Sequence, residues 1–161
     1  RSQPISEIVD KIQKLPKNNT IYLLSPIVRG RKGEYKKEIL NYKKRGFSKI
    51  KVDGKYLNID EFPNLNKKIK HDISIIVDRI ILNSNLGNRL ADSVETALNL
   101  SDGLLVVEYE NETLPKKYRK KESITFSSKF SCQEVGFTIE EVEQGFSHLI
   151  HLLELVKSVK V

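Results

Sequence analysis

The chain has 161 residues, of which 39% are hydrophobic and 30% are charged, a composition typical of a globular domain and not of a disordered chain. No apolar run approaches the roughly 18 residues that a membrane-spanning helix requires, and no basic-then-apolar leader opens the chain. The single cysteine, Cys132, excludes an internal disulfide framework, so we expect a cytoplasmic protein without a membrane partner.

The net charge of +7 is concentrated in residues 28–51, which carry ten basic and two acidic side chains. An exposed patch of this kind attracts phosphates or an acidic protein surface. Lysine outnumbers arginine 21 to 7 in the chain, whereas sequence-specific DNA readers favour the forked guanidinium of arginine. Two interpretations therefore stay open, a non-specific nucleic-acid-binding surface and an ordinary solvated helix face. The basic residues proposed for this surface are Arg29, Arg31, Lys32, Lys36, Lys37, Lys43, Lys44 and Arg45.

The first third of the chain reads as a helix followed by a strand. Apolar residues at spacings of three and four predict an amphipathic helix over residues 6–15. Residues 20–28 are apolar and β-branched and predict a strand, in which Pro26 indicates an edge or a strand end. The glycines and cations of residues 29–33 predict a turn after it.

A second helix and a hairpin follow. Residues 34–45 predict a charged helix with Ile39 and Leu40 facing inward, closed by a glycine C-cap. Residues 47–52 alternate between apolar and polar and predict a strand. The dipeptide Asp53-Gly54 then predicts a type I′ turn leading into a return strand.

The most apolar strand of the chain is predicted over residues 72–82, with Ile73, Ile75, Val77 and Ile81 facing the core. The remaining elements are a helix, two further strands and, between these strands, a basic loop. Strands that alternate with helices favour an α/β or α+β domain, with a mixed sheet covered by helices. The helix is predicted over residues 88–100 on Leu90, Val94, Ala97 and Leu98, the strands over 104–109 and 123–130, and the loop over 115–121.

Catalytic and metal-binding motifs are absent from the sequence. The segment Gly30–Gly33 lacks the spacing of a Walker A loop, and no nucleophile elbow or dinucleotide fingerprint is present. The three histidines His71, His148 and His151 have no acidic or cysteine neighbours at ligand spacing. Cys132 likewise lacks the second cysteine of a zinc ribbon. We therefore expect neither an enzyme nor a metal centre.

One ordered set of segments is specific enough to indicate a family. Residues 25–34 read SPIVRGRKGE and are similar to the APVVRGRKGE segment of UvrA, the damage-recognition ATPase of bacterial nucleotide excision repair. Four further matches follow in the same order, so the chain resembles this family over residues 3–143. They are residues 51–54 (KVDG), 67–79 (KKIKHDISIIVDR), 89–98 (RLADSVETAL) and 102–108 (DGLLVVE).

The resemblance implies a domain layout. Residues 1–110 correspond to the UvrB-binding domain of the family, and residues 111–143 to the start of the signature-domain region in its first ATPase half. The family's Walker A motif lies upstream and its ABC signature downstream, so the chain resembles an internal piece without ATPase activity. The full-length family uses ATP, Mg²⁺ and Zn²⁺, and we expect none of these in this chain. The implied partner is UvrB, with DNA bound only weakly if at all.

The resemblance also implies which residues bind UvrB. The family uses basic side chains before the Asp-Gly hairpin and at the end of the long apolar strand, positions that correspond to Lys49 and Arg79. Lys49 stands where the family usually has arginine, which keeps the charge but loses the bidentate fork. The alternative for Arg79 is an intramolecular ion pair that caps the strand.

The resemblance stops after Glu143, and residues 144–161 read as an apolar helix. When suitable codons are chosen for residues 148–156 and read from the third base of each, they encode Phe-Asn-Ser-Pro-Phe-Gly-Ala-Cys, a run with which the family continues. We interpret the tail as an out-of-frame extension after a one-base deletion, which the nucleotide sequence of the gene would test. A further alternative is then a remnant of a degraded gene, without a function.

Overall fold

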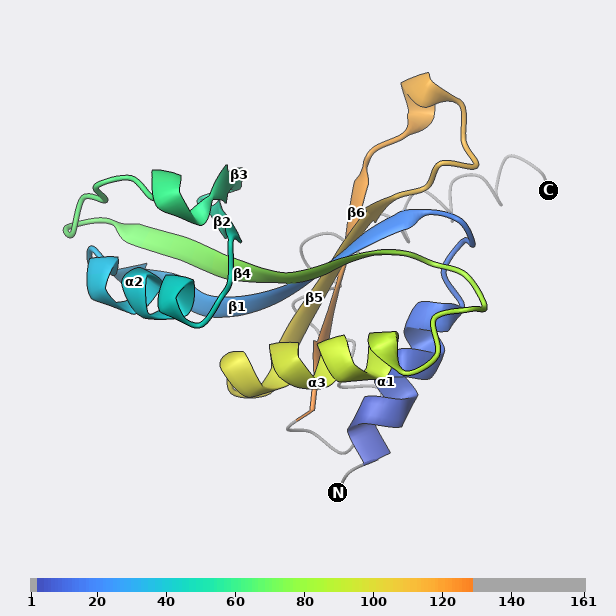
Figure 1. Ribbon diagram of the computed structural model, residues 1–161. Coiled ribbons are helices and arrows are strands. Elements are labelled where there is room, and N and C mark those ends of the chain that lie inside the picture. The colour runs from blue at the N-terminus through green and yellow to red at the C-terminus, as the bar shows by residue number, and fades with distance from the viewer. Residues whose placement is uncertain (1–2, 129–161) are drawn as a thin grey trace.

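The computed structural model describes residues 3–128, which form one β-sheet with helices packed against it (Figure 1). The predictions for Cys132, His148, His151 and the tail 144–161 lie outside the described residues, as does the end of the strand predicted over 123–130. The elements are α1 (Gln3–Gln13), β1 (Thr20–Lys32), α2 (Lys36–Lys44), β2 (Lys49–Val52), β3 (Lys55–Asn58), η1 (Ile59–Glu61), β4 (Lys70–Ile81), α3 (Arg89–Leu100), β5 (Leu104–Glu110), η2 (Lys116–Tyr118) and β6 (Lys121–Ser127).

The strand order is β3-β2-β4-β1-β5-β6. The predicted domain of helices packed on a sheet is confirmed, and the sheet within residues 3–128 is antiparallel at every pairing rather than mixed. Helix α2 connects β1 to β2, and α3 connects β4 to β5; the strands of each pair run parallel to each other. A third, antiparallel strand lies between them in both cases. The alternation of strands and helices in the sequence therefore produces no parallel ladder.

Two long strands, β1 and β4, form the spine of the sheet and pair along most of their length. On the outer side of β1, β5 pairs only with Ile21–Leu24, and on the outer side of β4, β2 pairs only with Ile73–Ile75. The domain therefore has two halves joined by the β1–β4 ribbon, as Figure 1 shows. One half contains α1, α3, β5 and β6, and the other contains α2, β2 and β3.

A β-bulge in β4 changes which of its side chains are buried. Val77 has no partner in β1, because the pairing register shifts by one residue beside it. Such an extra residue shifts the inside–outside alternation, so the odd-numbered Ile73 and Ile75 face the same side of the sheet as the even-numbered Ile80. Ile80 is 1% exposed and Ile81 is 51% exposed. The prediction that Ile81 faces the core is therefore wrong.

The turn predicted over residues 29–33 is also wrong, because β1 continues as far as Lys32. Gly30 has a φ of +61°, and its N–H donates to a carboxylate oxygen of Asp72 at 2.7 Å. A glycine in this left-handed conformation forms a bulge inside the ladder and does not end it. Pro26 lies within β1, beyond the last residue that pairs with β5 and next to another bulge, which are settings that tolerate proline in a sheet.

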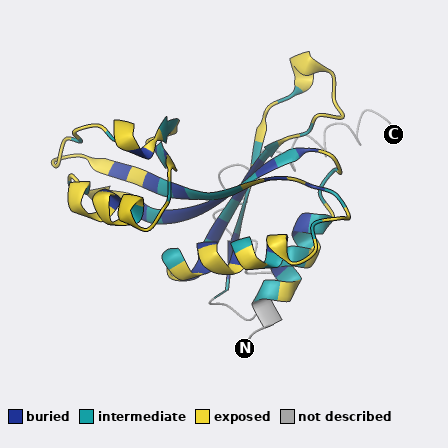
Figure 2. Cartoon of the chain, viewed as in Figure 1, coloured by how far each residue is buried: buried dark blue, intermediate teal, exposed yellow. Residues whose placement is uncertain are grey.

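The buried apolar side chains form two clusters, one in each half of the domain (Figure 2). In α2, Ile39 is 3% exposed, but the predicted inward position of Leu40 is wrong, since Leu40 is 51% exposed. Successive residues of a helix point about 100° apart, so only one of this pair faces the sheet. In α3 the prediction is confirmed, and its buried residues are Leu90, Val94, Ala97 and Leu98.

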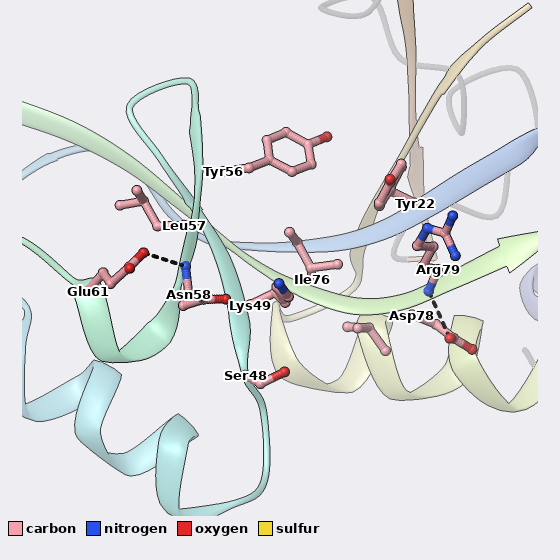
Figure 3. Close-up of a pocket in the computed structure, with 11 residues that line it drawn as sticks. Tyr22, Ser48, Lys49, Tyr56, Leu57, Asn58, Glu61, Ile76, Asp78 and Arg79 are labelled. Carbon is pink, nitrogen blue, oxygen red and sulfur yellow. Dashed lines mark hydrogen bonds between the residues drawn. The ribbon is translucent and has the colours of Figure 1, made fainter.

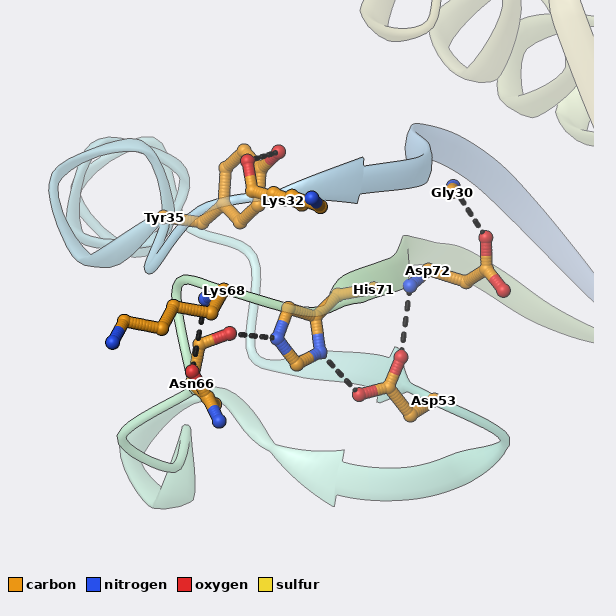
Figure 4. A network of polar contacts seen from close by, with 8 residues as sticks. All are labelled: Gly30, Lys32, Tyr35, Asp53, Asn66, Lys68, His71 and Asp72. Carbon is orange, nitrogen blue, oxygen red and sulfur yellow. Dashed lines mark hydrogen bonds and ion pairs between the residues drawn. The ribbon is translucent and has the colours of Figure 1, made fainter.

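The predicted type I′ hairpin is confirmed by positive φ values at Asp53 (+47°) and Gly54 (+88°). The Asp53 carboxylate accepts the backbone N–H of Asp72 at 2.8 Å and lies 2.7 Å from Nδ1 of His71 (Figure 4). The other ring nitrogen of this buried histidine lies 2.7 Å from the carbonyl oxygen of Asn66. Both nitrogens thus face acceptors, and only the protonated ring donates to both. The Asn66 carbonyl and the Asp53 carboxylate accordingly raise the pKa of His71.

This arrangement predicts a stability that falls as the pH rises through neutrality. A raised folded-state pKa contributes stability that is complete below the unfolded value of about 6.5 and is lost as the pH passes the folded value. Burial raises the pKa of Asp53, but the Asp72 N–H and His71 outweigh it and lower that pKa, so Asp53 stays ionised in this range. Urea denaturation between about pH 6 and pH 9 should show a decline for the natural chain and a smaller one for His71→Asn. Equal declines in the two proteins would contradict the role of His71.

Candidate protein-interaction surface

A pocket of about 580 Å³ opens where β2 separates from β4 (Figure 3). β2 pairs with β4 only as far as Ile75, and the following part of β4 is uncovered on that side. Lys49, the first residue of β2, and Arg79, near the end of β4, both line this pocket. The structure therefore brings together two residues that are 30 positions apart and that the family resemblance assigned to partner binding.

Asp78 forms a polar cluster beside Arg79. Its carboxylate accepts from the guanidinium of Arg89 at 2.9 Å and from the Ser93 hydroxyl at 2.7 Å, so it joins the end of β4 to α3. Burial raises the pKa of Asp78, but the hydrogen bonds from Arg89 and Ser93 outweigh burial and hold that pKa below its usual value. The same carboxylate accepts the backbone N–H of Arg79 at 2.8 Å.

Arg79 is exposed and makes no ion pair within residues 3–128. The ion pair at this end of β4 is formed by Arg89, which also donates to the backbone carbonyl of Arg79 at 3.2 Å. Both backbone groups of Arg79 are therefore occupied, which blocks strand addition at this point of the β4 edge. At this edge, the Arg79 side chain is therefore more available for contacts than the Arg79 backbone.

Glu108 of β5 is a buried carboxylate, 4% exposed, that connects the two halves of the domain. It accepts from the ammonium of Lys51 in β2 and from the hydroxyl of Tyr56 in β3. Neither strand is adjacent to β5 in the sheet, so these contacts cross its open face. Tyr56 also meets Tyr22 edge-to-face, with ring centroids 5.7 Å apart, and the two rings form an aromatic wall of the pocket.

The eight cations of the proposed basic surface are all exposed and lie at the end of β1 and in or next to α2, in the half of the domain that contains α2, β2 and β3. Lys43 forms an ion pair with Asp60 at 2.5 Å. The guanidinium of Arg45 lies 5.5 Å from the ring centroid of Tyr42. The other six make no ion pair with any described residue. None of the eight lines the pocket beside β4.

Sequence reasoning missed Tyr22, Tyr56, Arg89 and Glu108. Only Glu108 could have been found from the sequence. It is the one acid in the otherwise apolar segment 104–109, and a carboxylate buried in such a strand requires polar partners. The partners themselves come from strands more than 50 residues earlier, and no local pattern indicates them.

A family model described as the UvrA interaction domain matches residues 3–111 of the chain. The chain belongs to this family. It is 51% identical to the UvrABC system protein A of Rickettsia prowazekii and 54% identical to that of Rickettsia bellii, each over 144 residues. It is 46% identical over 154 residues to the UvrABC system protein A of Bradyrhizobium diazoefficiens.

Each of these matches covers 88% of the chain, which itself spans only 15–16% of the relative's length. The predicted resemblance to the UvrA family is thereby confirmed, and the chain corresponds to part of the length of the UvrABC system protein A relatives. Among residues 3–128, no helix is both long and apolar enough to cross a bilayer. The same residues contain no group of three or more potential metal ligands.

Proposed function

We propose that this UvrA interaction domain binds UvrB through the pocket beside β4 and has no ATPase activity of its own. The observation that carries the proposal is that Lys49 and Arg79 line one pocket and that neither makes an ion pair within residues 3–128. These two cations lie beside the Tyr22–Tyr56 wall. Protein interfaces are often anchored by such an aromatic surface together with charged groups that pair with carboxylates of the partner.

The proposal includes the domain layout, with residues 1–110 as the interaction domain and 111–143 as the start of the signature-domain region. The UvrA family model ends at residue 111, which supports the first boundary. The tail 144–161 is proposed to be an out-of-frame extension, and the nucleotide sequence of the gene tests that part separately. An intact reading frame unrelated to the family's continuation would contradict it.

Calorimetric titration of the chain with purified UvrB tests the main proposal. We expect saturable binding with one partner per chain and no ATP hydrolysis by the chain alone. A chain shown to be folded by circular dichroism that releases no heat at any practical concentration would contradict UvrB binding.

A second candidate function is non-specific nucleic-acid binding by the basic surface of β1 and α2. The observation in its favour is that seven of its eight cations make no ion pair with a described residue. Electrostatic binding of this kind predicts a steep loss of affinity with salt and no need for a protein partner.

A further inference from the structure

The loop between β5 and β6, residues 111–120, stands away from the body of the domain. Figure 1 shows it projecting beyond the sheet, and Figure 2 shows its surface as mostly exposed. None of its ten residues is buried. Only its first residue falls within the match to the UvrA interaction domain, and none of its residues belongs to the two surfaces described so far. This segment is termed the β5–β6 loop below.

Polar contacts brace the β5–β6 loop. The guanidinium of Arg119 donates to the carbonyls of Leu114 at 2.8 Å and Glu112 at 3.0 Å, joining the two arms of the loop. The backbone N–H of Glu112 donates to the Asn19 side chain at 3.1 Å, which anchors the loop to the residue before β1. A loop that is already ordered loses less conformational entropy when it binds a ligand.

The outer surface of the β5–β6 loop combines positive charge with an exposed aromatic ring. Lys116, Lys117 and Lys120 are exposed and make no ion pair within the described part of the chain. Tyr118 is 61% exposed, the most exposed of the large hydrophobic side chains in the described part. The ammonium of Lys117 lies 5.1 Å from the centroid of the Tyr118 ring, so charge and ring are presented side by side.

We propose that the β5–β6 loop binds single-stranded nucleic acid, with the lysines contacting phosphates and Tyr118 stacking on an unpaired base. Ammonium groups alternating with an exposed ring match the backbone and base of a single strand. The bases of a duplex are already stacked on each other and offer no face to the ring. The proposal is independent of UvrB binding, because no residue of the loop lines the pocket beside β4.

Fluorescence anisotropy with labelled oligo(dT) of about 20 nucleotides, compared with the same strand in a duplex, tests this inference. The double variant Lys116→Ser/Lys117→Ser should weaken binding to the single strand and reduce the salt slope by about 1.4, since each phosphate contact contributes about 0.7 for single strands. Tyr118→Ala should weaken it about tenfold and leave the salt slope unchanged. All three side chains are exposed, so circular dichroism should show unchanged folding.

The matched control is Lys67→Ser/Lys68→Ser, which removes the same charge from two adjacent exposed lysines just before β4, outside both the β5–β6 loop and the basic surface of β1 and α2. We expect it to retain nearly the natural affinity. An equal loss from this control, natural affinity in Tyr118→Ala, or tighter binding of the duplex would each overturn the proposal. A preference for polyglutamate over oligo(dT) at equal ionic strength would overturn it as well, in favour of an acidic protein partner.

Photocrosslinking provides a readout that does not depend on a variant. Oligo(dT) carrying bromouracil should crosslink to the peptide that contains Tyr118, as identified by mass spectrometry. Crosslinks confined to α2 or to the end of β1 would overturn the assignment to the β5–β6 loop and support the second candidate function.

Discussion

Arg79→Glu should abolish measurable binding to UvrB, with a loss of affinity of about 100-fold or more. Removing a charged side chain from the centre of an interface typically costs about 2 kcal/mol of binding free energy. Reversing its charge adds repulsion against the carboxylate of the partner. Arg79 makes no ion pair within residues 3–128, so the free energy of unfolding should change by less than about 0.5 kcal/mol. Calorimetry and urea denaturation of the same preparation separate the two effects.

The control for this prediction is Lys14→Glu, which makes the same charge change at an exposed residue just after α1 and outside the pocket. It should reduce the affinity only slightly, through the lower net charge. Lys49→Arg adds a sharper test, because a guanidinium pairs with a carboxylate through two parallel hydrogen bonds and should tighten binding. Arg79→Glu and Lys14→Glu with equal affinities would contradict a binding site in the pocket.

Glu108→Ala should lower the free energy of unfolding by about 3 kcal/mol, which is the usual cost of removing one partner from a buried ion pair. The substitution leaves the Lys51 ammonium and the Tyr56 hydroxyl without their acceptor at a point where Lys51 is only 24% exposed. Burial and the Glu108 carboxylate both raise the pKa of Tyr56, so its hydroxyl stays protonated and needs an acceptor.

Urea denaturation measures this loss, and Glu110→Ala is its matched control. Glu110 lies two residues along the same strand but is exposed, so its removal should cost less than about 0.5 kcal/mol. Tyr56→Phe alone should lower the free energy of unfolding by about 1.5 kcal/mol. In the Glu108→Ala background it should lower it much less, because both changes break the same hydrogen bond. Full additivity of the two losses would show that Glu108 does not hold Tyr56.

In the candidate site, the residues could be named from the sequence, whereas the pocket that they line could not be predicted from it. The family resemblance placed Lys49 and Arg79 among the candidates, but the pocket that they share exists only because β2 leaves β4 at Ile75. The length of a ladder depends on how two strands diverge under the twist of the sheet, and no residue pattern in either strand reports that point. The Tyr22–Tyr56 wall likewise depends on strands 34 residues apart.

The sequence by itself determined the elements whose patterns are local. The spacing of Leu90, Val94 and Leu98 specified the buried face of α3, and Asp53-Gly54 specified the hairpin, since each depends on side-chain period or backbone preference within a few residues. The same local rules placed Ile81 in the core, because a period of two holds only while the ladder has no extra residue.

Only the tertiary structure decided where that ladder is interrupted and what crosses the open face of the sheet. The bulge at Val77 is a property of the pairing between β1 and β4, and it selects Ile80 for the core. Glu108 is likewise only an acid in an apolar strand until the fold brings Lys51 and Tyr56 to it from strands on the other side of the β1–β4 ribbon. Both features follow from how distant strands align. The alignment with the lowest free energy depends on side chains and hydrogen bonds across the whole sheet, so no single segment specifies it.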